Sequence, residues 1–335
     1  MTPLIEIRGL CKTYPVQGGF LDGILPGRRS LLTALEGIDL DLAPGEIFSL
    51  VGESGSGKTT LGRTLLRLVE PTSGEIRFRG EDLLSMGPGR MRAIRRDLQM
   101  VFQDPWSSLN PRLTVGKMLS EVLLVHGIAK GAAARARVAE LLDLVGLPAE
   151  AANRYPRHFS GGQRQRIGIA RALAVDPVFI VADEPVSAVD VSVQAQIMNL
   201  LLDLRDRLGL TLLVIAHDLS VVRYVSDRVA VMYLGRIVET APAADFFSSP
   251  RHPYTRGLMA AAPRTSPKTR RGAAAITGEP PSPLAPPLGC PFNPRCRHAD
   301  AGCREAVPQL ENLGGGHLVR CFKHASLGHH AVADN

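Results

Sequence analysis

The sequence predicts an α/β protein whose core is a mostly parallel, largely buried sheet. Short apolar runs of strand length alternate along the chain with segments of helical periodicity, as expected when parallel strands are joined by helices. The first of these strands runs directly into a glycine-rich loop of the kind that binds phosphate. The chain has 335 residues, of which 45% are hydrophobic, so it is long enough for about two globular domains.

The elements of this fold can be placed in order along the chain. Apolar runs predict strands at residues 47–51, 178–182 and 211–216. A helix is expected to begin near Thr60, because Leu61, Leu65 and Leu68 recur at helical spacing. Further helices are predicted at residues 115–147, 164–173 and 200–208. Since the long helical stretch lies between strands, we expect a helical subdomain at about residues 104–172.

The composition changes after residue 262. Nine of the 25 prolines lie in residues 263–294, where they remove hydrogen-bond donors and block regular elements. We therefore expect a nucleotide-binding domain at residues 1–262 and a Pro-rich C-terminal extension at residues 263–335. Only one phosphate loop is present, so the chain carries one nucleotide module.

Charge and hydropathy exclude several classes of protein. The formal net charge is +7, from 39 Lys and Arg against 32 Asp and Glu, without a basic stripe, and only 5% of residues are aromatic. We therefore expect no nucleic-acid surface. No apolar run reaches the ~18 residues that a bilayer span requires. The first residues also lack the basic and apolar regions of a secretory signal.

The strongest motif is the phosphate loop, which fits G-x-x-x-x-G-K-[ST] between a predicted strand and a predicted helix. Its backbone N–H groups would surround phosphate oxygens, Lys58 would reach the β- and γ-phosphates, and the Thr59 hydroxyl would bind Mg²⁺. The alternative is a glycine turn without a ligand. The residues predicted to contact nucleotide are Gly52, Glu53, Ser54, Gly55, Ser56, Gly57, Lys58, Thr59 and Thr60.

A second motif ends the predicted strand at residues 178–182. Asp183 and Glu184 follow it at the edge where a parallel sheet presents ligands. Asp183 could hold Mg²⁺, and Glu184 is placed to polarise water. The alternative is a solvated strand end, but the phosphate loop upstream favours the catalytic interpretation.

Between these motifs lies the tetrapeptide Ser160, Gly161, Gly162 and Gln163, which leads into a predicted helix. By itself it could be a capping turn with Ser160 as N-cap. Together with the other motifs it resembles the signature of the ATP-binding subunits of ABC transporters, although Phe159 stands where the family usually has Leu. By the same resemblance, Gln103 corresponds to the Q-loop glutamine, residues 187–190 to the D-loop, His217 to the switch histidine and Tyr14 to the aromatic that stacks on adenine.

The resemblance is closest to the dipeptide and oligopeptide importers and covers almost the whole chain. The segments that carry it are residues 101–112, 181–188, 252–255, 278–284 and 289–296. Leu61, Gly62 and Arg63 after the phosphate loop, and the insertion at residues 16–30, resemble the second ATPase subunit of a dipeptide permease. Val189 replaces the usual D-loop Leu.

The resemblance implies an ATPase that powers peptide import. It implies a P-loop fold of ABC type with N-terminal antiparallel strands, and catalytic roles for Glu184, His217, Gln103 and Lys58. Mg²⁺ would be bound by Thr59, Gln103 and Asp183, while Asp190 would lie beside the nucleotide. ATP would be held between Lys58 and a partner's signature, so the active unit would be a dimer.

The implied partners are a second ATP-binding subunit, two permease subunits and, indirectly, a substrate-binding protein. The implied location is the cytoplasmic face of the inner membrane, as a peripheral subunit. Two alternatives remain from sequence: a soluble ABC ATPase acting on nucleic acid or ribosomes, and an importer subunit for nickel, opines or glutathione.

Four of the five cysteines cluster near the end of the chain, at Cys290, Cys296, Cys303 and Cys321. In a cytosolic protein such clustering favours metal over disulfides. Four thiolates suit Zn²⁺ or an iron-sulfur cluster, and reduced thiols are a third possibility. The resemblance implies a 4Fe-4S cluster. A third class of function left open is a redox or metal sensor that uses the C-terminal extension alone, as an added regulatory role. His298 and His317 are candidate replacement ligands, and Cys11 is expected to be a buried small side chain.

Overall fold

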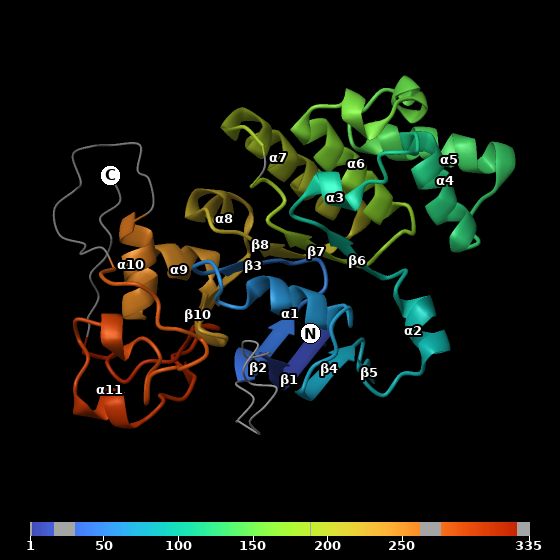
Figure 1. Ribbon diagram of the computed structural model, residues 1–335. Coiled ribbons are helices and arrows are strands. Elements are labelled where there is room, and N and C mark those ends of the chain that lie inside the picture. Colours follow the sequence, from blue (N-terminus) through green and yellow to red (C-terminus); the bar gives the residue numbers. More distant parts are fainter. Residues whose placement is uncertain (1, 17–30, 188, 262–275, 327–335) are drawn as a thin grey trace, which may run out of the picture. The chain divides into compact units, whose positions relative to one another are not determined.

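The computed structural model describes residues 2–16, 31–187, 189–261 and 276–326, which form two compact units (Figure 1). The helical unit comprises Leu42–Ile47 and Ser85–Ala216. The phosphate-loop unit comprises Thr2–Asp41, Phe48–Leu84 and the described chain from His217 onward. Residues 17–30 of the predicted insertion, Ala188 of the D-loop and residues 263–275 of the extension lie outside the described residues.

The helical unit is built on three parallel strands. They are β6 (Leu98–Val101), β7 (Phe179–Asp183) and β8 (Thr211–Ile215), with β7 between the other two. Every residue of β7 and β8 is buried, which explains why these segments are apolar without alternation. The predicted strands are therefore confirmed, with ends shifted by one residue.

The helical stretches predicted for this unit are present, but the last helix begins well before residue 200, and the helix at residues 88–94 was not predicted. They are α2 (Pro88–Ile94), α3 (Pro105–Ser108), α4 (Val115–Val125), α5 (Gly131–Leu144), α6 (Gly161–Leu173) and α7 (Val191–Leu208), with short 3₁₀ turns η1 (Ala149–Asn153) and η2 (Pro156–His158). The stretch expected to be wholly helical at residues 115–147 is instead interrupted: α4 ends at Val125, and Gly127 follows its C-cap residue. This glycine has a φ of +66°, and the N–H of Ile128 donates to the Leu123 carbonyl at 2.8 Å, which closes a Schellman turn.

The main sheet of the phosphate-loop unit is mixed. Strand β3 (Ile47–Val51) runs parallel to β9 (Arg228–Tyr233). Three further strands continue it in antiparallel fashion: β10 (Arg236–Pro242), β12 (Leu318–Val319) and β11 (Glu311–Asn312). The parallel core predicted from sequence is confirmed for β3 with β9 and for β6 to β8. The antiparallel strands of the main sheet were not predicted; they begin where Leu234 and Gly235, with φ of +44° and +76°, make a two-residue hairpin turn.

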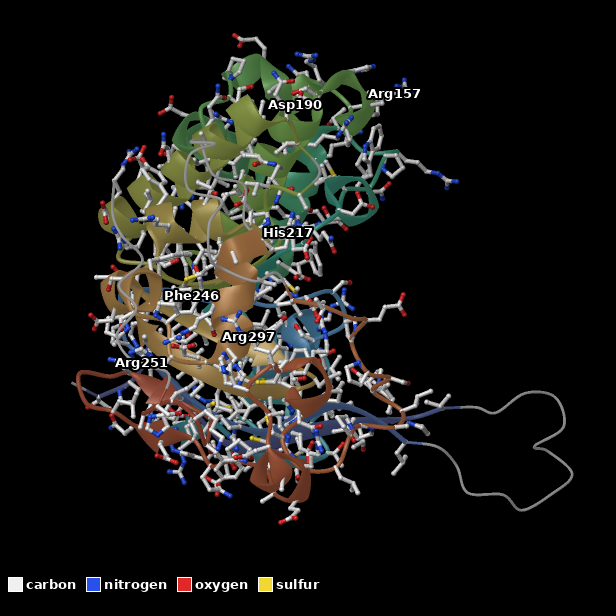
Figure 2. All side chains as sticks on the ribbon, turned by 90° about the vertical axis from the view of Figure 1, so that its left-hand side faces the viewer. Arg157, Asp190, His217, Phe246, Arg251 and Arg297 are labelled. Carbon is white, nitrogen blue, oxygen red and sulfur yellow. The ribbon has the colours of Figure 1, made fainter. Side chains whose placement is uncertain are left out.

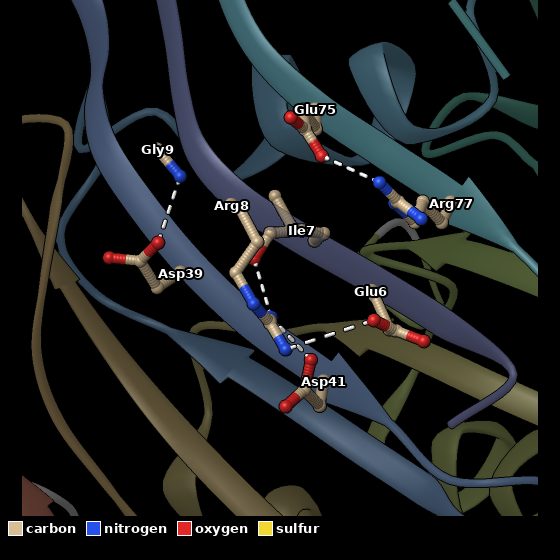
Figure 3. Close-up of polar contacts among 8 residues, drawn as sticks. All are labelled: Glu6, Ile7, Arg8, Gly9, Asp39, Asp41, Glu75 and Arg77. Carbon is tan, nitrogen blue, oxygen red and sulfur yellow. Dashed lines mark hydrogen bonds and ion pairs between the residues drawn. The ribbon is translucent and has the colours of Figure 1, made fainter. Parts of the chain in front are cut away.

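A second, antiparallel sheet contains the N-terminal strands that were expected. Its order is β2-β1-β4-β5, formed by β1 (Ile5–Pro15), β2 (Leu31–Leu42), β4 (Ser73–Phe78) and β5 (Glu81–Asp82). Figure 3 shows how polar contacts join β1 to β2: Arg8 donates to the Asp41 carboxylate, and the Gly9 N–H donates to Asp39 at 2.8 Å. The hydrogen bond to Asp41 raises the pKa of Arg8.

The helices of the phosphate-loop unit are short. They are α1 (Lys58–Leu65), α8 (Leu219–Val225), α9 (Ala243–Ser248), α10 (Pro253–Ala261) and α11 (Ala301–Glu305), with the 3₁₀ turn η4 (Asn293–Arg295). Leu68 was predicted on the first helix, but it lies beyond α1 and is 49% exposed. Cys11 is half-buried rather than buried, and its sulfur accepts a hydrogen bond from the Gly37 N–H. Among the described residues, no helix has both the length and the apolar character needed to cross a membrane.

The described part of the C-terminal extension, residues 276–326, is called the tail. It joins the main sheet through β12, where Val319 pairs with Glu239 of β10. Phe292 anchors it as well: its ring is 3% exposed and lies 5.3 Å from the rings of both Tyr233 and Tyr254. The tail is too rich in Pro and Gly to form its own apolar core, so it uses aromatic residues of the unit on which it packs.

We predict that Phe292→Ala destabilises the protein by about 3 to 5 kcal/mol, because a buried aromatic ring is removed from a packed cluster. The free energy of unfolding from chemical denaturation measures this loss. Leu288→Ala in the same segment is the control, since Leu288 is 86% exposed and should change stability little. Equal losses in the two variants would show that Phe292 does not anchor the tail.

Candidate functional site

The predicted phosphate loop connects β3 to α1 in the phosphate-loop unit. Two of its glycines are required by close backbone contacts. A Cβ atom on Gly52 would lie 2.3 Å from the Met232 carbonyl oxygen, and one on Gly57 would lie 2.4 Å from that of Ala34. Their φ angles of +150° and +104° also disfavour any side chain. The glycines therefore allow the loop to lie against two neighbouring strands.

Lys58 is folded into this loop. Its side chain is buried, and Nζ donates to the carbonyl oxygens of Gly52 at 2.7 Å and Glu53 at 2.9 Å, with Ser56 Oγ at 3.4 Å. The ammonium group is thus held beside the first turn of α1, where backbone N–H groups and the helix dipole favour an anion. The other loop residues are half-buried or exposed: Ser54, Gly55, Thr59 and Thr60. This arrangement suits phosphate.

The carboxylates predicted after the strand lie at the end of β7 in the helical unit. Asp183 is its last residue and is 2% exposed. Glu184 follows with a φ of +44°, a left-handed conformation that costs a residue with a side chain on the order of 1–3 kcal/mol. Its N–H donates to the Ile215 carbonyl at 3.0 Å, and its own carbonyl accepts from the Ser187 hydroxyl at 3.1 Å. These bonds hold Glu184 in the strained conformation.

Gln103 and Glu184 are brought together by this sheet. Strands β6 and β7 are parallel with Val101 opposite Ala182, so the residues that follow them meet at the same edge. The Gln103 side-chain amide donates to the Glu184 carboxylate at 2.7 Å. Two residues 81 positions apart in the sequence therefore form one polar pair in the helical unit.

The tetrapeptide at residues 160–163 begins α6. Ser160 is the N-cap: its hydroxyl accepts from the Gln163 N–H at 3.3 Å, and the Gln163 side chain accepts from the Ser160 N–H at 3.1 Å. This reciprocal pair is a capping box. Gly161 is half-buried, and a Cβ atom on Gly162 would lie 2.2 Å from Val193 of α7. The tetrapeptide thus has a structural role in fixing the start of α6 close to α7.

Two arginines of α6 hold the segment that follows Gln103. The Arg164 guanidinium lies 3.7 Å from the centre of the Trp106 ring, a cation–π contact. Arg171 donates to the Ser108 carbonyl. Burial lowers the pKa of both arginines. The sequence motifs did not reveal these contacts, because they join residues more than fifty positions apart.

The remaining predicted nucleotide residues lie in both units. Asp190 is exposed and occupies the N-cap position of α7 in the helical unit, although its side chain makes no capping hydrogen bond (Figure 2). His217 is exposed and precedes α8 in the phosphate-loop unit, and Figure 2 labels it. Tyr14 is half-buried on β1, with the Lys12 ammonium 4.8 Å from its ring centre. Phosphate loop, Tyr14 and His217 thus share one unit, whereas the carboxylates, Gln103 and the tetrapeptide share the other.

The four clustered cysteines line one cavity in the phosphate-loop unit. His252 and Phe292 are among the other residues that line it. Burial raises the pKa of Cys290 to about 11 and that of Cys321 to about 12. Burial also raises the pKa of Cys296. Nevertheless, the part of the chain that the structure describes holds no group of three or more His, Cys, Asp or Glu side chains arranged to bind a metal ion. The geometry therefore gives no support to the metal prediction beyond bringing the four sulfurs to one cavity.

Neither predicted replacement ligand lines this cavity. His317 Nε2 lies 2.8 Å from the fully buried carboxylate of Glu239, which also accepts from the backbone N–H groups of Arg251 and His252. His298 is contacted instead by Arg297 at 3.1 Å. The histidine that does line the cavity, His252, was not predicted as a ligand. Desolvation lowers its pKa to about 4.

Comparison with known proteins decides the family. Residues 35–187 match the ABC transporter family, and residues 238–303 match the C-terminal region of the oligopeptide/dipeptide transporter family. The dipeptide transport ATP-binding protein DppF of Haemophilus influenzae is 48% identical over 321 residues, which cover 96% of this chain and 97% of that protein. This chain belongs to the ATP-binding proteins of ABC transporters. A Brucella ovis protein named as a peptide import ATP-binding protein is 50% identical over 322 residues, covering 96% of this chain and 98% of its own.

Solved structures of other ABC ATP-binding proteins share the fold. A dimeric ATP-binding cassette in a post-hydrolysis state, bound to ADP and Pi, is 32% identical with a TM-score of 0.63, and covers 71% of this chain and 98% of its own. The protein cbiO1 from Clostridium perfringens, part of an ABC transporter complex, is 26% identical with a TM-score of 0.62, and covers 74% of this chain and 91% of its own. The P-loop fold of ABC type is thereby confirmed for this ATP-binding protein.

We predict that Gly162→Ala destabilises this ATP-binding protein by about 1 to 3 kcal/mol, because the new methyl group would overlap Val193. The double variant Gly162→Ala with Val193→Ala should regain much of the lost stability. Gly168→Ala on the same helix is the control: its Cβ would meet no atom within 4 Å, and alanine favours a helix over glycine by about 1 kcal/mol. Thermal unfolding measures all three, and a Gly162→Ala variant as stable as the control would contradict the close contact.

Proposed function

We propose that this chain is the ATP-hydrolysing subunit of an importer for dipeptides and oligopeptides. The observation that carries this proposal is a complete phosphate loop, with Lys58 folded into it, in a chain that is 48–50% identical to named peptide-import ATP-binding proteins over 96% of its length. The match of residues 238–303 to the C-terminal region of oligopeptide and dipeptide transporters favours peptides as cargo. We further propose that residues 1–262 form the nucleotide-binding domain and residues 263–335 the extension.

The substrate would be ATP with Mg²⁺. Lys58 and the N–H groups of the phosphate loop would bind phosphate oxygens, and Tyr14 would stack on adenine. Thr59, Asp183 and Gln103 are oxygen donors of the kind that Mg²⁺ prefers, and the buried position of Asp183 suits a carboxylate that is charge-compensated by a cation. Mg²⁺ supplies charge neutralisation at the phosphates when bound.

Glu184 would act as the general base toward the attacking water. Two observations support this role: its backbone is held in a strained conformation, and its carboxylate accepts a 2.7 Å hydrogen bond from Gln103. Gln103 would orient the carboxylate, and His217 would orient the γ-phosphate. Strain maintained at a residue by specific hydrogen bonds is typical of functional positions.

The active unit would contain two ATP-binding chains. Lys58 of one chain would face Ser160, Gly161, Gly162 and Gln163 of another, and Asp190 would lie near this shared nucleotide. A dimeric relative supports such an arrangement. The second chain would be a different ATP-binding subunit of the same importer, and both chains would contact the membrane permease subunits. The chain would then be a peripheral subunit at the cytoplasmic face of the inner membrane, supplied with cargo by a substrate-binding protein.

We predict that Glu184→Gln retains MgATP binding but lowers ATP turnover by about 10² to 10⁴, because the general base is removed. Phosphate release and uptake of a radiolabelled dipeptide are measured after reconstitution with the permease subunits and the second ATPase. Glu150→Gln is the control, since Glu150 is exposed in the same unit. Parental turnover in Glu184→Gln would exclude Glu184 as the base, and ATP turnover without dipeptide uptake in the parent would exclude peptides as cargo.

We also propose that Cys290, Cys296, Cys303 and Cys321 hold a 4Fe-4S cluster. The convergence of the four sulfurs on one cavity, beside the apolar ring of Phe292, supports this donor set. When bound, the cluster would supply four metal–thiolate bonds that hold the tail segments together. A tetrahedral zinc site is the alternative for the same four thiols.

We predict that anaerobically purified protein contains about four irons per chain and is brown. Cys296→Ser should lower the iron content, whereas Cys11→Ser should not, because Cys11 lies on β1 outside the cavity. Metal analysis and visible absorption measure both. Colourless protein with one zinc per chain would show that the four cysteines form a zinc site and not a 4Fe-4S cluster. Metal-free protein with a protease-resistant tail would contradict both assignments.

A further inference from the structure

The tail makes a partly buried ion pair with the phosphate loop. Arg295, in the turn η4, donates from Nη1 to one Glu53 carboxylate oxygen at 2.7 Å and from Nη2 to the other at 2.9 Å. The Arg295 side chain is 6% exposed and that of Glu53 is 27% exposed. The two residues are 242 positions apart in the sequence. Two parallel bonds between a buried guanidinium and a carboxylate fix both position and orientation, unlike an exposed ion pair.

Glu53 is held at its backbone as well as at its side chain. Its N–H donates to the Tyr254 hydroxyl at 2.9 Å. Its carbonyl oxygen accepts from Lys58 Nζ at 2.9 Å and from the Ser56 N–H at 3.2 Å. The residue that Arg295 holds therefore provides one of the carbonyl groups that hold the phosphate-binding lysine.

Arg295 is in turn fixed by the packing of the tail. Its Nη1 also lies 3.4 Å from the Tyr233 hydroxyl, and the bonds to Glu53 raise its pKa, so the guanidinium remains charged. Phe292, three residues earlier, packs on Tyr233 and on Tyr254. Cys296, the next residue, lines the cysteine cavity. A displacement of the tail would therefore move Arg295 relative to Glu53.

We propose that Arg295 is a positioning residue for nucleotide binding: by clamping Glu53 it fixes the phosphate loop and Lys58, so that affinity for MgATP depends on a docked tail. The inference rests on the proposed nucleotide site and adds to it a residue outside the nucleotide motifs. Arg295 acts through Glu53 and does not itself contact phosphate. Since misplacing a binding group by about 1 Å can cost up to about 10²-fold, loss of the clamp should have a measurable effect.

The test measures the affinity of full-length protein for MgATP by isothermal titration calorimetry. Arg295→Met should weaken binding about tenfold, in the range typical of coupling between sites. Arg295→Lys should recover part of the affinity, because it keeps the charge but loses the bidentate geometry. The double variant Glu53→Gln with Arg295→Met should bind MgATP no less tightly than the single variant with the lower affinity, because both substitutions remove the same interaction. Arg304→Gln, an exposed arginine of the tail, is the control and should bind like the parent.

Distinct outcomes separate this inference from the proposed nucleotide site. Parental affinity in folded Arg295→Met, or losses that add in the double variant, would overturn the clamp while leaving the site intact. If Arg295→Met fails to fold, the affinity of Glu53→Gln for MgATP decides instead, because this substitution keeps the size of the side chain. Parental affinity in Glu53→Gln would then overturn the clamp. Lys58→Ala tests the site itself: parental affinity in that variant would contradict the proposed nucleotide site and with it this inference.

Discussion

The structure of the phosphate-loop unit depends on the close approach of three backbone segments. The loop passes within van der Waals contact of β2 and of the end of β9, at positions where only glycine leaves room. Hydrogen bonds lock the same junction: the Gly235 N–H donates to the Ser56 carbonyl at 2.9 Å, and the Glu36 N–H donates to the Gly235 carbonyl at 2.8 Å. The loop is therefore shaped by neighbouring strands as well as by its own sequence. That constraint directs the Lys58 ammonium into the loop and leaves the first turn of α1 as an anion-binding end.

In the helical unit the corresponding constraint lies at the ends of parallel strands. Burial of β7 and β8 on both faces leaves the polar residues at their carboxyl ends as the places where chemistry can occur. Gln103 and Glu184 meet there because their strands are adjacent and in register. Arginines of α6 then fix the segment that follows Gln103, with Arg164 on the ring of Trp106. Helix α6 and the segment after Gln103 are consequently packed together.

The tail shows how a segment without a core of its own becomes ordered. Phe292 enters an aromatic cluster, β12 extends the main sheet, and the Glu239 carboxylate collects two backbone N–H groups and His317. These contacts order the tail by protein interactions, in addition to any metal that its cysteines hold. The sequence did not reveal these contacts, because each involves a partner distant in the chain.

The sequence alone determined the family, the phosphate loop, the strand that ends in Asp183 and the tetrapeptide at the start of α6, because each is a local pattern whose backbone geometry follows from neighbouring residues. It also predicted the buried strands, which their continuous apolar runs identify. Only the tertiary structure decided that Gln103 binds Glu184, that His317 binds Glu239 rather than lining the cysteine cavity, and that Arg295 binds Glu53. Local patterns specify helices, strands and loops. Side-chain partners depend instead on how sheets and loops bring distant residues together, and no local window of the sequence shows which residues will meet.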